Sequence, residues 1–276
     1  MEDLYKRICK NIKTSEIIFL AVLAGYLLSY LLKFQIGQGL LGIPLLIWYP
    51  GFFLLSFFSI QNRFGKLGQF SLSVFGSFNL NMLAGHLVQK SYGLNTDIQV
   101  LAPTVLCLGL FIAYALNKAR QKRSEPYSID KGLVAMIVVA ILGFLTLIIL
   151  NPLPQNLDNY LSVLKLSIIK NTNLLGARQI FLAFPTLAGK YLSIAPYYLV
   201  HYLYYFLFFV STLFYLDFIK RKGLGALTSW ALFLIFFGAP AIITEVYRPM
   251  PQVILLSHTF IILILLSESL EHERPW

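Results

Sequence analysis

The chain is poor in charge and in cysteine. Charged residues fill 12% of its 276 positions, whereas soluble domains carry about 25%. Hydrophobic residues make up 58% of the sequence, and the mean hydropathy is +0.72. This balance excludes an ordinary soluble domain and predicts an all-α, polytopic membrane protein. The two cysteines, Cys9 and Cys107, fall in a predicted cytosolic tail and a predicted membrane helix, so we expect no disulfide between them.

Several catalytic motifs are also missing from the sequence. It contains no P-loop, GxSxG, HExxH or CxxC pattern, so nothing indicates a phosphate-binding loop, a serine hydrolase or a zinc site. No Lys/Arg-rich arm with interleaved aromatics accompanies the net charge of +10. We therefore expect no nucleic-acid partner and attribute the cations to membrane topology. The first apolar run is long enough to span and reads as a retained helix rather than a cleaved signal peptide.

Long apolar runs are what the sequence does contain. A membrane helix needs about 20 mostly apolar residues. Eight runs meet this length, and the sequence therefore predicts about eight spans, with seven or nine as alternatives if 179–189 enters the membrane. The predicted spans are 15–34, 39–60, 68–89, 98–117, 132–151, 193–217, 224–244 and 251–268.

The distribution of Lys and Arg gives the predicted orientation. When alternate loops are assigned to opposite sides, fifteen of the 22 cations fall on one side. The other side holds Lys33, Lys90, Lys165, Lys170, Arg178, Lys190 and Arg248. Positive charge accumulates on the cytoplasmic side of membrane proteins. We therefore predict a cell-membrane protein with both termini in the cytoplasm and the long segment 152–192 outside.

The first half, 1–117, is predicted to be a four-helix membrane region. Pro44 and Pro50-Gly51 interrupt its second span, so we expect a kink near Tyr49. The runs "IPLLIWYPGFFLLSFF" and "LSVFGSFNLNMLAG" resemble a four-helix N-terminal region of some large prokaryotic membrane proteins. That region has no assigned activity and is sometimes attached to glycosyltransferase-like modules.

The second half, 132–276, follows a basic cytoplasmic connector, 118–131. Its long outer segment places Asp158, Ser162 and Lys165 on one helical stripe, opposite a broad apolar side. This periodicity predicts an amphipathic helix lying in the membrane interface. Asp158 has two interpretations at this point, as a solvated helix cap or as a working carboxylate. The C-terminal run "SESLEHERPW" is predicted to be a frayed, solvated end.

The segments "NLDNYLSVLKLSIIKN", "ARQIFLAFPTLAG", "LDFIKRKG" and "TEVYRPMP" resemble the core of the GT-C class of glycosyltransferases, which use lipid-phosphate sugar donors. The resemblance implies that Asp158 is the acid of the outer loop and that Glu245 is a loose candidate for a second acid. It implies a polyprenyl-phosphate sugar and membrane lipid as partners. One carboxylate stands where the class has an acidic pair, so we expect a short or degenerate relative.

The chemistry of sugar transfer assigns further residues. It needs a carboxylate that deprotonates the acceptor or binds a divalent cation, and cations that stabilise the leaving phosphate. A divalent cation is thus a candidate cofactor, although no residue is predicted to be a metal ligand. The candidate substrate-binding residues are Lys165, Arg178, Lys190, Arg248 and His201. Each has a structural alternative: the cations as headgroup anchors, and His201, like His258, as a hydrogen-bonded histidine inside the bundle.

Three functions remain open from the sequence. The first is a GT-C-like glycosyltransferase acting at the extracytoplasmic face. The second is a non-catalytic scaffold or subunit of a cell-envelope assembly, with a membrane-protein partner. The third is a small transporter, suggested by the proline-broken helices but disfavoured because almost no ionisable group is predicted at mid-membrane depth.

Overall fold

The computed structural model describes residues 14–58, 60–92, 96–117, 131–150, 180–194, 196–238 and 251–271. These ranges are helical and contain no strand, which confirms the predicted all-α class. The elements are α2 (Thr14–Leu31), α3 (Gln35–Ile47), α4 (Tyr49–Phe57), the 3₁₀ helix η1 (Ile60–Arg63), α5 (Lys66–Tyr92), α6 (Thr96–Asn117), α7 (Lys131–Leu150), α9 (Ile180–Leu192), α10 (Pro196–Arg221), α11 (Ala226–Gly238) and α13 (Pro251–Glu271).

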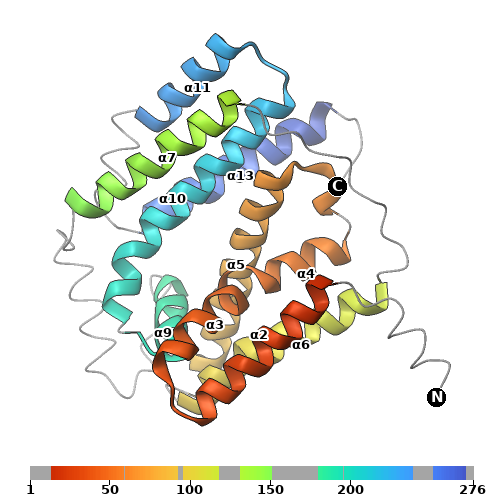
Figure 1. Cartoon of the computed structure of the whole chain (residues 1–276), viewed down its shortest axis with the longest axis vertical. Helices are drawn as coiled ribbons and strands as arrows, with labels where there is room; N and C mark the ends of the chain where they lie inside the picture. The colour runs from red at the N-terminus through yellow and green to blue at the C-terminus, as the bar shows by residue number, and fades with distance from the viewer. Residues whose placement is uncertain are drawn as a thin grey trace.

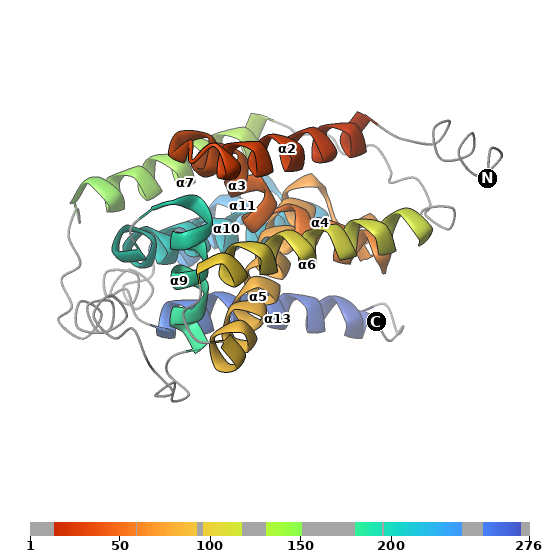
Figure 2. The ribbon, with the colours of Figure 1, turned by 90° about the horizontal axis from the view of Figure 1, so that it is seen from below.

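The long helices run back and forth between two ends of the molecule (Figures 1 and 2). At one end α2 leads into α3, α5 leads into α6, and α10 begins. We call this the α5–α6 end. At the opposite end, the α4–α5 end, α4 leads through η1 into α5, and α10 leads into α11. The short helix α9 lies against α3, α5, α6 and α10 and does not run from one end to the other.

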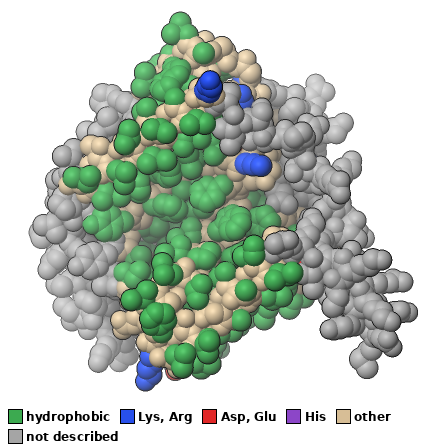
Figure 3. All heavy atoms as spheres, viewed as in Figure 1, with side chains coloured by type: hydrophobic (Ala, Val, Ile, Leu, Met, Phe, Trp, Pro, Cys, Tyr) green, Lys and Arg blue, Asp and Glu red, His purple; other side chains and the backbone are tan. Residues whose placement is uncertain are grey.

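Two helical stretches, Gln35–Phe57 and Asp97–Asn117, are long and apolar enough to cross a membrane by length and composition. Shorter apolar stretches occur at Ser15–Leu31, Lys131–Thr146, Ala226–Phe236 and His258–Glu268. Many large hydrophobic side chains point outward, among them Leu31 and Ile149. Figure 3 shows such side chains spread over the visible face, with only a few cations near its rims. This apolar exterior suits a lipid environment better than water.

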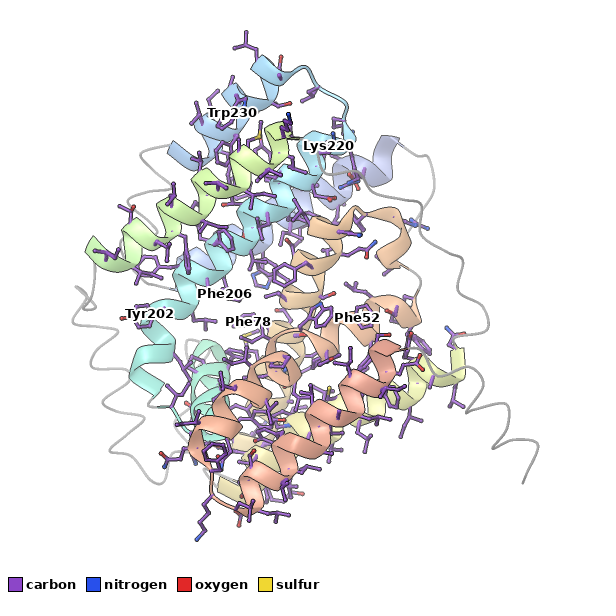
Figure 4. The ribbon with its side chains drawn as sticks, viewed as in Figure 1. Phe52, Phe78, Tyr202, Phe206, Lys220 and Trp230 are labelled. Carbon is purple, nitrogen blue, oxygen red and sulfur yellow. The ribbon has the colours of Figure 1, made fainter. Side chains whose placement is uncertain are left out.

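Helix α5 lies between the two halves of the chain and contacts both. It packs against α3, α4 and α6 on one side and against α9 and α10 on the other. The largest hydrophobic core is therefore continuous and includes Phe19 and Phe53 from the first half and Tyr191 and Phe214 from the second. Figure 4 shows Phe52, Phe78 and Phe206 in the middle of the bundle, where the halves meet.

The predicted kink lies at Trp48, between α3 and α4. Proline has no backbone N–H, so Pro50 leaves the carbonyl of Leu46 without its helical donor. The Asn81 side chain of α5 donates to that carbonyl at 2.8 Å. The next amide, Gly51 N–H, donates to the Ser77 hydroxyl at 2.8 Å. These two backbone groups at the break are thus satisfied by side chains of α5, which an apolar surrounding favours.

Gly51 allows α4 and α5 to approach closely enough for these bonds. A Cβ atom built on Gly51 would lie 1.9 Å from the Ser73 carbonyl oxygen and 2.7 Å from the Ser77 nitrogen. Both atoms belong to the backbone and cannot rotate away. The pair Pro50-Gly51 therefore has two roles, since the proline breaks the helix and the glycine brings the broken ends to α5.

We expect Gly51→Ala to destabilise the protein by at least about 1–3 kcal/mol, because the methyl group forces α4 away from α5. Thermal unfolding of the purified protein in detergent measures the effect. Gly109→Ala in α6 is the matched control, since its Cβ would meet nothing within 4 Å. The control should be neutral or slightly stabilising, and equal unfolding temperatures for the two variants would contradict the packing argument.

Candidate functional site

The sequence-predicted site falls largely outside the described residues. Those outside are Asp158, Glu245, Lys165, Arg178 and Arg248. His201 lies in the second turn of α10, and its side chain is not described. Lys190 lies in the last turn of α9 and is half-buried. Lys190 is therefore the residue of the predicted site whose side chain the structure describes, and contacts of α9 with neighbouring helices position it.

Helix α9 is held by the first half of the chain. The rings of Tyr191 and Tyr26 stack at 4.3 Å between centroids, and the Tyr26 hydroxyl donates to the Tyr191 carbonyl at 3.0 Å. On α6, the Thr104 hydroxyl lies 3.4 Å from the Tyr191 hydroxyl. Gly42 of α3 leaves room for these contacts, since a Cβ there would lie 2.7 Å from Leu192. We call the contacts of Tyr26, Gly42 and Thr104 with the C-terminal turn of α9 the α9 seat. Three helices of the first half thus fix the C-terminal turn of α9.

A second set of bonds fixes the turn between α9 and α10. The Ser193 hydroxyl donates to the Gln38 Oε1, and the Gln38 Nε2 donates to the Ser29 carbonyl at 3.2 Å. Ser193 has φ +55°, an uncommon conformation for a residue with a side chain. These contacts define how the chain leaves α9 and enters α10 at the α5–α6 end.

Lys190 precedes Tyr191 and shares its fixed position. Burial lowers the pKa of the Lys190 ammonium below its usual value, because a partly desolvated cation loses hydration. An ammonium in this state gains more from a nearby anion than a fully hydrated lysine would. Lys190 is therefore a partly desolvated cation near the C-terminal end of α9.

His258 of α13 points into the bundle, as its predicted depth required. Its Nε2 lies 3.1 Å from Oδ1 and 2.8 Å from Nδ2 of Asn79 on α5. The amide therefore offers a partner to either tautomer of the ring. Phe75 packs edge-on against the imidazole, 5.1 Å between centroids. This arrangement agrees with the interpretation of His258 as a hydrogen-bonded bundle histidine.

A charged cluster at the α4–α5 end was not predicted. Asp217 of α10 is fully buried, and its Oδ2 accepts from Arg221 Nε at 2.8 Å and from Gly65 N–H at 3.2 Å. Arg221 also pairs through Nη1 with Glu268 of α13. Its guanidinium lies 4.8 Å from the ring centroid of Phe64. The cluster joins α5, α10 and α13.

The prediction of a frayed, solvated C-terminal run is wrong for its first residues. Helix α13 continues to Glu271, and Glu268 is 6% exposed because it pairs with Arg221. The spacing of Asp217 and Arg221, four residues apart in a helix, was a visible signal of an ion pair. The partnership with Glu268 depends on the packing of α13 beside α10 and left no such signal.

The described residues offer no group of three or more His, Cys, Asp or Glu side chains that could hold a metal ion. In broken transporter helices, freed backbone groups can face a substrate. Two such groups at the break between α3 and α4 are instead bonded within the protein. The Leu46 carbonyl and the Gly51 amide are both bonded to α5. Lys190, beside the α9 seat, is the charged residue of the predicted site that the structure describes.

Comparison with known proteins gives no relative to set beside this arrangement: no family model, no curated protein and no solved structure matches the chain.

We expect Arg221→Met to destabilise the protein by about 3–5 kcal/mol, because it leaves two buried carboxylates without their cation. The triple variant Asp217→Asn, Arg221→Met, Glu268→Gln removes all three charges and should recover much of the loss. Unfolding of each variant in detergent, monitored by circular dichroism, measures the difference. A triple variant as unstable as the single one would show that charge compensation is not what the cluster provides.

Proposed function

We propose that the chain is an eight-span membrane protein with both termini in the cytoplasm. The proposal is supported by the helices of the described residues, with the interrupted α3–α4 taken as one: α2, α3–α4, α5, α6, α7, α10, α11 and α13. They coincide in order with the eight apolar runs of the sequence. The break at Trp48 leaves α3 and α4 as one interrupted pass, and α9 is an additional short helix.

The cations of the described residues support the orientation. Those at the α4–α5 end are Arg63, Lys66, Lys131, Lys220, Arg221 and Lys222, whereas Lys33, Lys90 and Lys190 are at the α5–α6 end. Figure 4 places Lys220 near the end of α10. The positive-inside rule then makes the α4–α5 end cytoplasmic. The α5–α6 end, with the seat of α9, is extracytoplasmic.

The second half of this protein is, in our proposal, a GT-C-like unit that acts on a lipid-phosphate-linked sugar at the outer face. The observation that carries it is the position of Lys190. This half-buried cation lies near the end of α9, in the same predicted outer segment, 152–192, as Asp158. A sugar carried on a lipid phosphate needs a cation near the membrane surface and a carboxylate on the same side.

Each residue has a defined chemical role in this proposal. Asp158 takes the proton from the acceptor hydroxyl as that oxygen attacks the anomeric carbon. The bond between this carbon and the phosphate oxygen breaks, and the lipid phosphate leaves with the bonding electron pair. Lys190 stabilises the negative charge on the leaving phosphate. The Tyr26–Tyr191 stack holds Lys190 where it meets the phosphate.

The topology gives a direct test. In a chain without its native cysteines, we expect Tyr92→Cys at the α5–α6 end to react with a membrane-impermeant maleimide in intact cells. Gly225→Cys at the opposite end should react only after the membrane is opened. Both positions suit labelling because Tyr92 is 64% exposed and a Cβ on Gly225 meets nothing within 4 Å. Labelling of both positions in intact cells, or of neither, would reject the proposed arrangement.

The activity has its own test. Membranes containing the protein and an added acceptor with free hydroxyl groups should transfer the sugar from a radiolabelled polyprenyl-phosphate hexose to that acceptor. Asp158→Asn should reduce this rate by at least about 100-fold, since a general base contributes that much. Lys190→Gln should reduce it too, and Lys190→Arg should restore part of it because the charge returns.

Asp97→Asn is the matched control, because Asp97 lies at the same end but accepts a hydrogen bond from Tyr30 at 3.0 Å. Its rate should stay near that of the wild type. If wild-type membranes leave the lipid-linked sugar intact, the enzyme proposal fails and the scaffold interpretation is favoured. If Asp158→Asn is as active as the wild type, Asp158 has no catalytic role.

A further inference from the structure

The turn that leads into α5 packs against the last turns of α10 at the α4–α5 end. The Phe64 ring lies 5.7 Å from the Phe214 ring between centroids, and the Arg221 guanidinium lies 4.8 Å from the centroid of Phe64. The next residue, Gly65, donates its N–H to Asp217 at 3.2 Å, across 152 residues of sequence. We call these two segments, 63–66 and 217–222, the α5–α10 joint.

The joint is closely packed. A Cβ atom built on Gly68, in the first turn of α5, would lie 2.5 Å from Asp217 Oδ2. Asp217 is fully buried and also accepts from Arg221 Nε at 2.8 Å. The contacts through Phe64, Gly65 and Gly68 therefore hold the two segments side by side, and the cations that the segments carry belong to one surface of the bundle.

The joint carries more positive than negative charge. The carboxylates there are Asp217 and Glu268, both buried and both paired with Arg221. Five cations against these two carboxylates leave a formal excess of three positive charges among the described residues. Arg63 and Lys66 are exposed, so part of the excess is on the outer side of the joint. The five cations are Arg63, Lys66, Lys220, Arg221 and Lys222.

Exposed aromatic rings accompany these cations. Lys66 and Phe70 share one face of α5, because residues four apart in a helix are neighbours. Phe70 lies one turn, about 5.4 Å, further from the helix end than Lys66, and it is 38% exposed. Phe58, at the end of α4, is 61% exposed. A cation at the end of the bundle with an apolar ring one turn deeper fits a molecule with an anionic head and an apolar chain.

We propose that the outer side of the α5–α10 joint binds the headgroup of an anionic phospholipid. Arg63 and Lys66 contact the headgroup phosphate, Lys220 adds positive charge from α10, and Phe70 contacts the upper part of an acyl chain. A soluble acidic peptide would satisfy the cations but would leave the exposed rings in water. Lipid bound at this position contacts the joint between the two halves of the chain and stabilises the folded state by mass action.

The inference goes beyond sugar transfer and rests on the membrane placement in the proposed function. In that placement the α4–α5 end faces the cytoplasmic leaflet. Anionic lipids give this leaflet a negative surface potential, which attracts Lys and Arg close to the membrane.

The test measures which lipid stays bound to the protein. Purified protein is equilibrated in neutral detergent micelles with equal amounts of phosphatidylglycerol and phosphatidylcholine, and native mass spectrometry gives the ratio of the two bound lipids. The wild type should prefer phosphatidylglycerol. In the double variant Arg63→Gln, Lys66→Gln this preference should fall about fivefold to twenty-fivefold, because each cation near an anionic surface contributes about a factor of five.

Lys33→Gln, Lys90→Gln is the matched control, since it removes the same charge from exposed lysines at the α5–α6 end. It should keep the preference of the wild type. Phe70→Ala should reduce the binding of both lipids without changing their ratio, because an acyl chain is common to both. If the Arg63, Lys66 double variant does not fold, Lys66→Gln alone should lower the preference about fivefold.

Two results would reject the lipid site at the joint. One is equal binding of the two lipids by the wild type, and the other is a loss of preference in the Lys33, Lys90 control as large as in the Arg63, Lys66 variant. Glycerol phosphate should displace no more phosphatidylglycerol than sodium chloride of equal ionic strength does. Greater displacement would show a site for free phosphate instead. None of these results bears on the maleimide labelling or the sugar-transfer assay, so the proposed function stands or fails separately.

Discussion

The structure depends on one constraint, the need to satisfy backbone polar groups inside an apolar bundle. Pro50 removes the donor that the Leu46 carbonyl would have in a continuous helix. In an apolar surrounding no bulk water replaces it. The Asn81 amide and the Ser77 hydroxyl of α5 fill the two positions left open. The break is therefore compatible with burial only when α5 lies against it, and this requirement fixes the centre of the molecule.

The composition of α5 follows from that position. It carries serines, asparagines and glycines on the faces that meet other helices, and its hydropathy does not place it among the two candidate spans. Gly51 and Gly85 reduce the distance to α4 and α9, while Asn79 pairs with His258 of α13. Directly before its first residue, Lys66, the Gly65 N–H donates to the buried Asp217 of α10. A single polar helix thus joins both halves of the chain, and a more apolar helix could not make these bonds.

The sequence was sufficient for the features that depend on local chemistry. The apolar runs predicted the helical class, and Pro44 and Pro50-Gly51 predicted the interruption that the structure has at Trp48. The charged cluster was missed because Glu268 lies 47 residues from Arg221, and local periodicity carries no information about such a pair. The seat of α9 was missed for the same reason, since Tyr26 and Tyr191 are 165 residues apart. Asp158 and Glu245 lie outside the described residues, so their roles remain predictions.

Buried polar side chains lie at both ends of the bundle. At the α4–α5 end, Arg221 pairs with both Asp217 and Glu268, and the Gly65 N–H, just before α5, donates to Asp217. At the α5–α6 end, Gln38 is bonded at both ends of its amide and Gln99 at neither. Unpaired buried atoms occur at both ends, among them Asp217 Oδ1 and Arg221 Nη2 as well as both ends of the Gln99 amide. The charged cluster therefore compensates its charges within the bundle while part of its hydrogen-bonding capacity stays unused among the described residues.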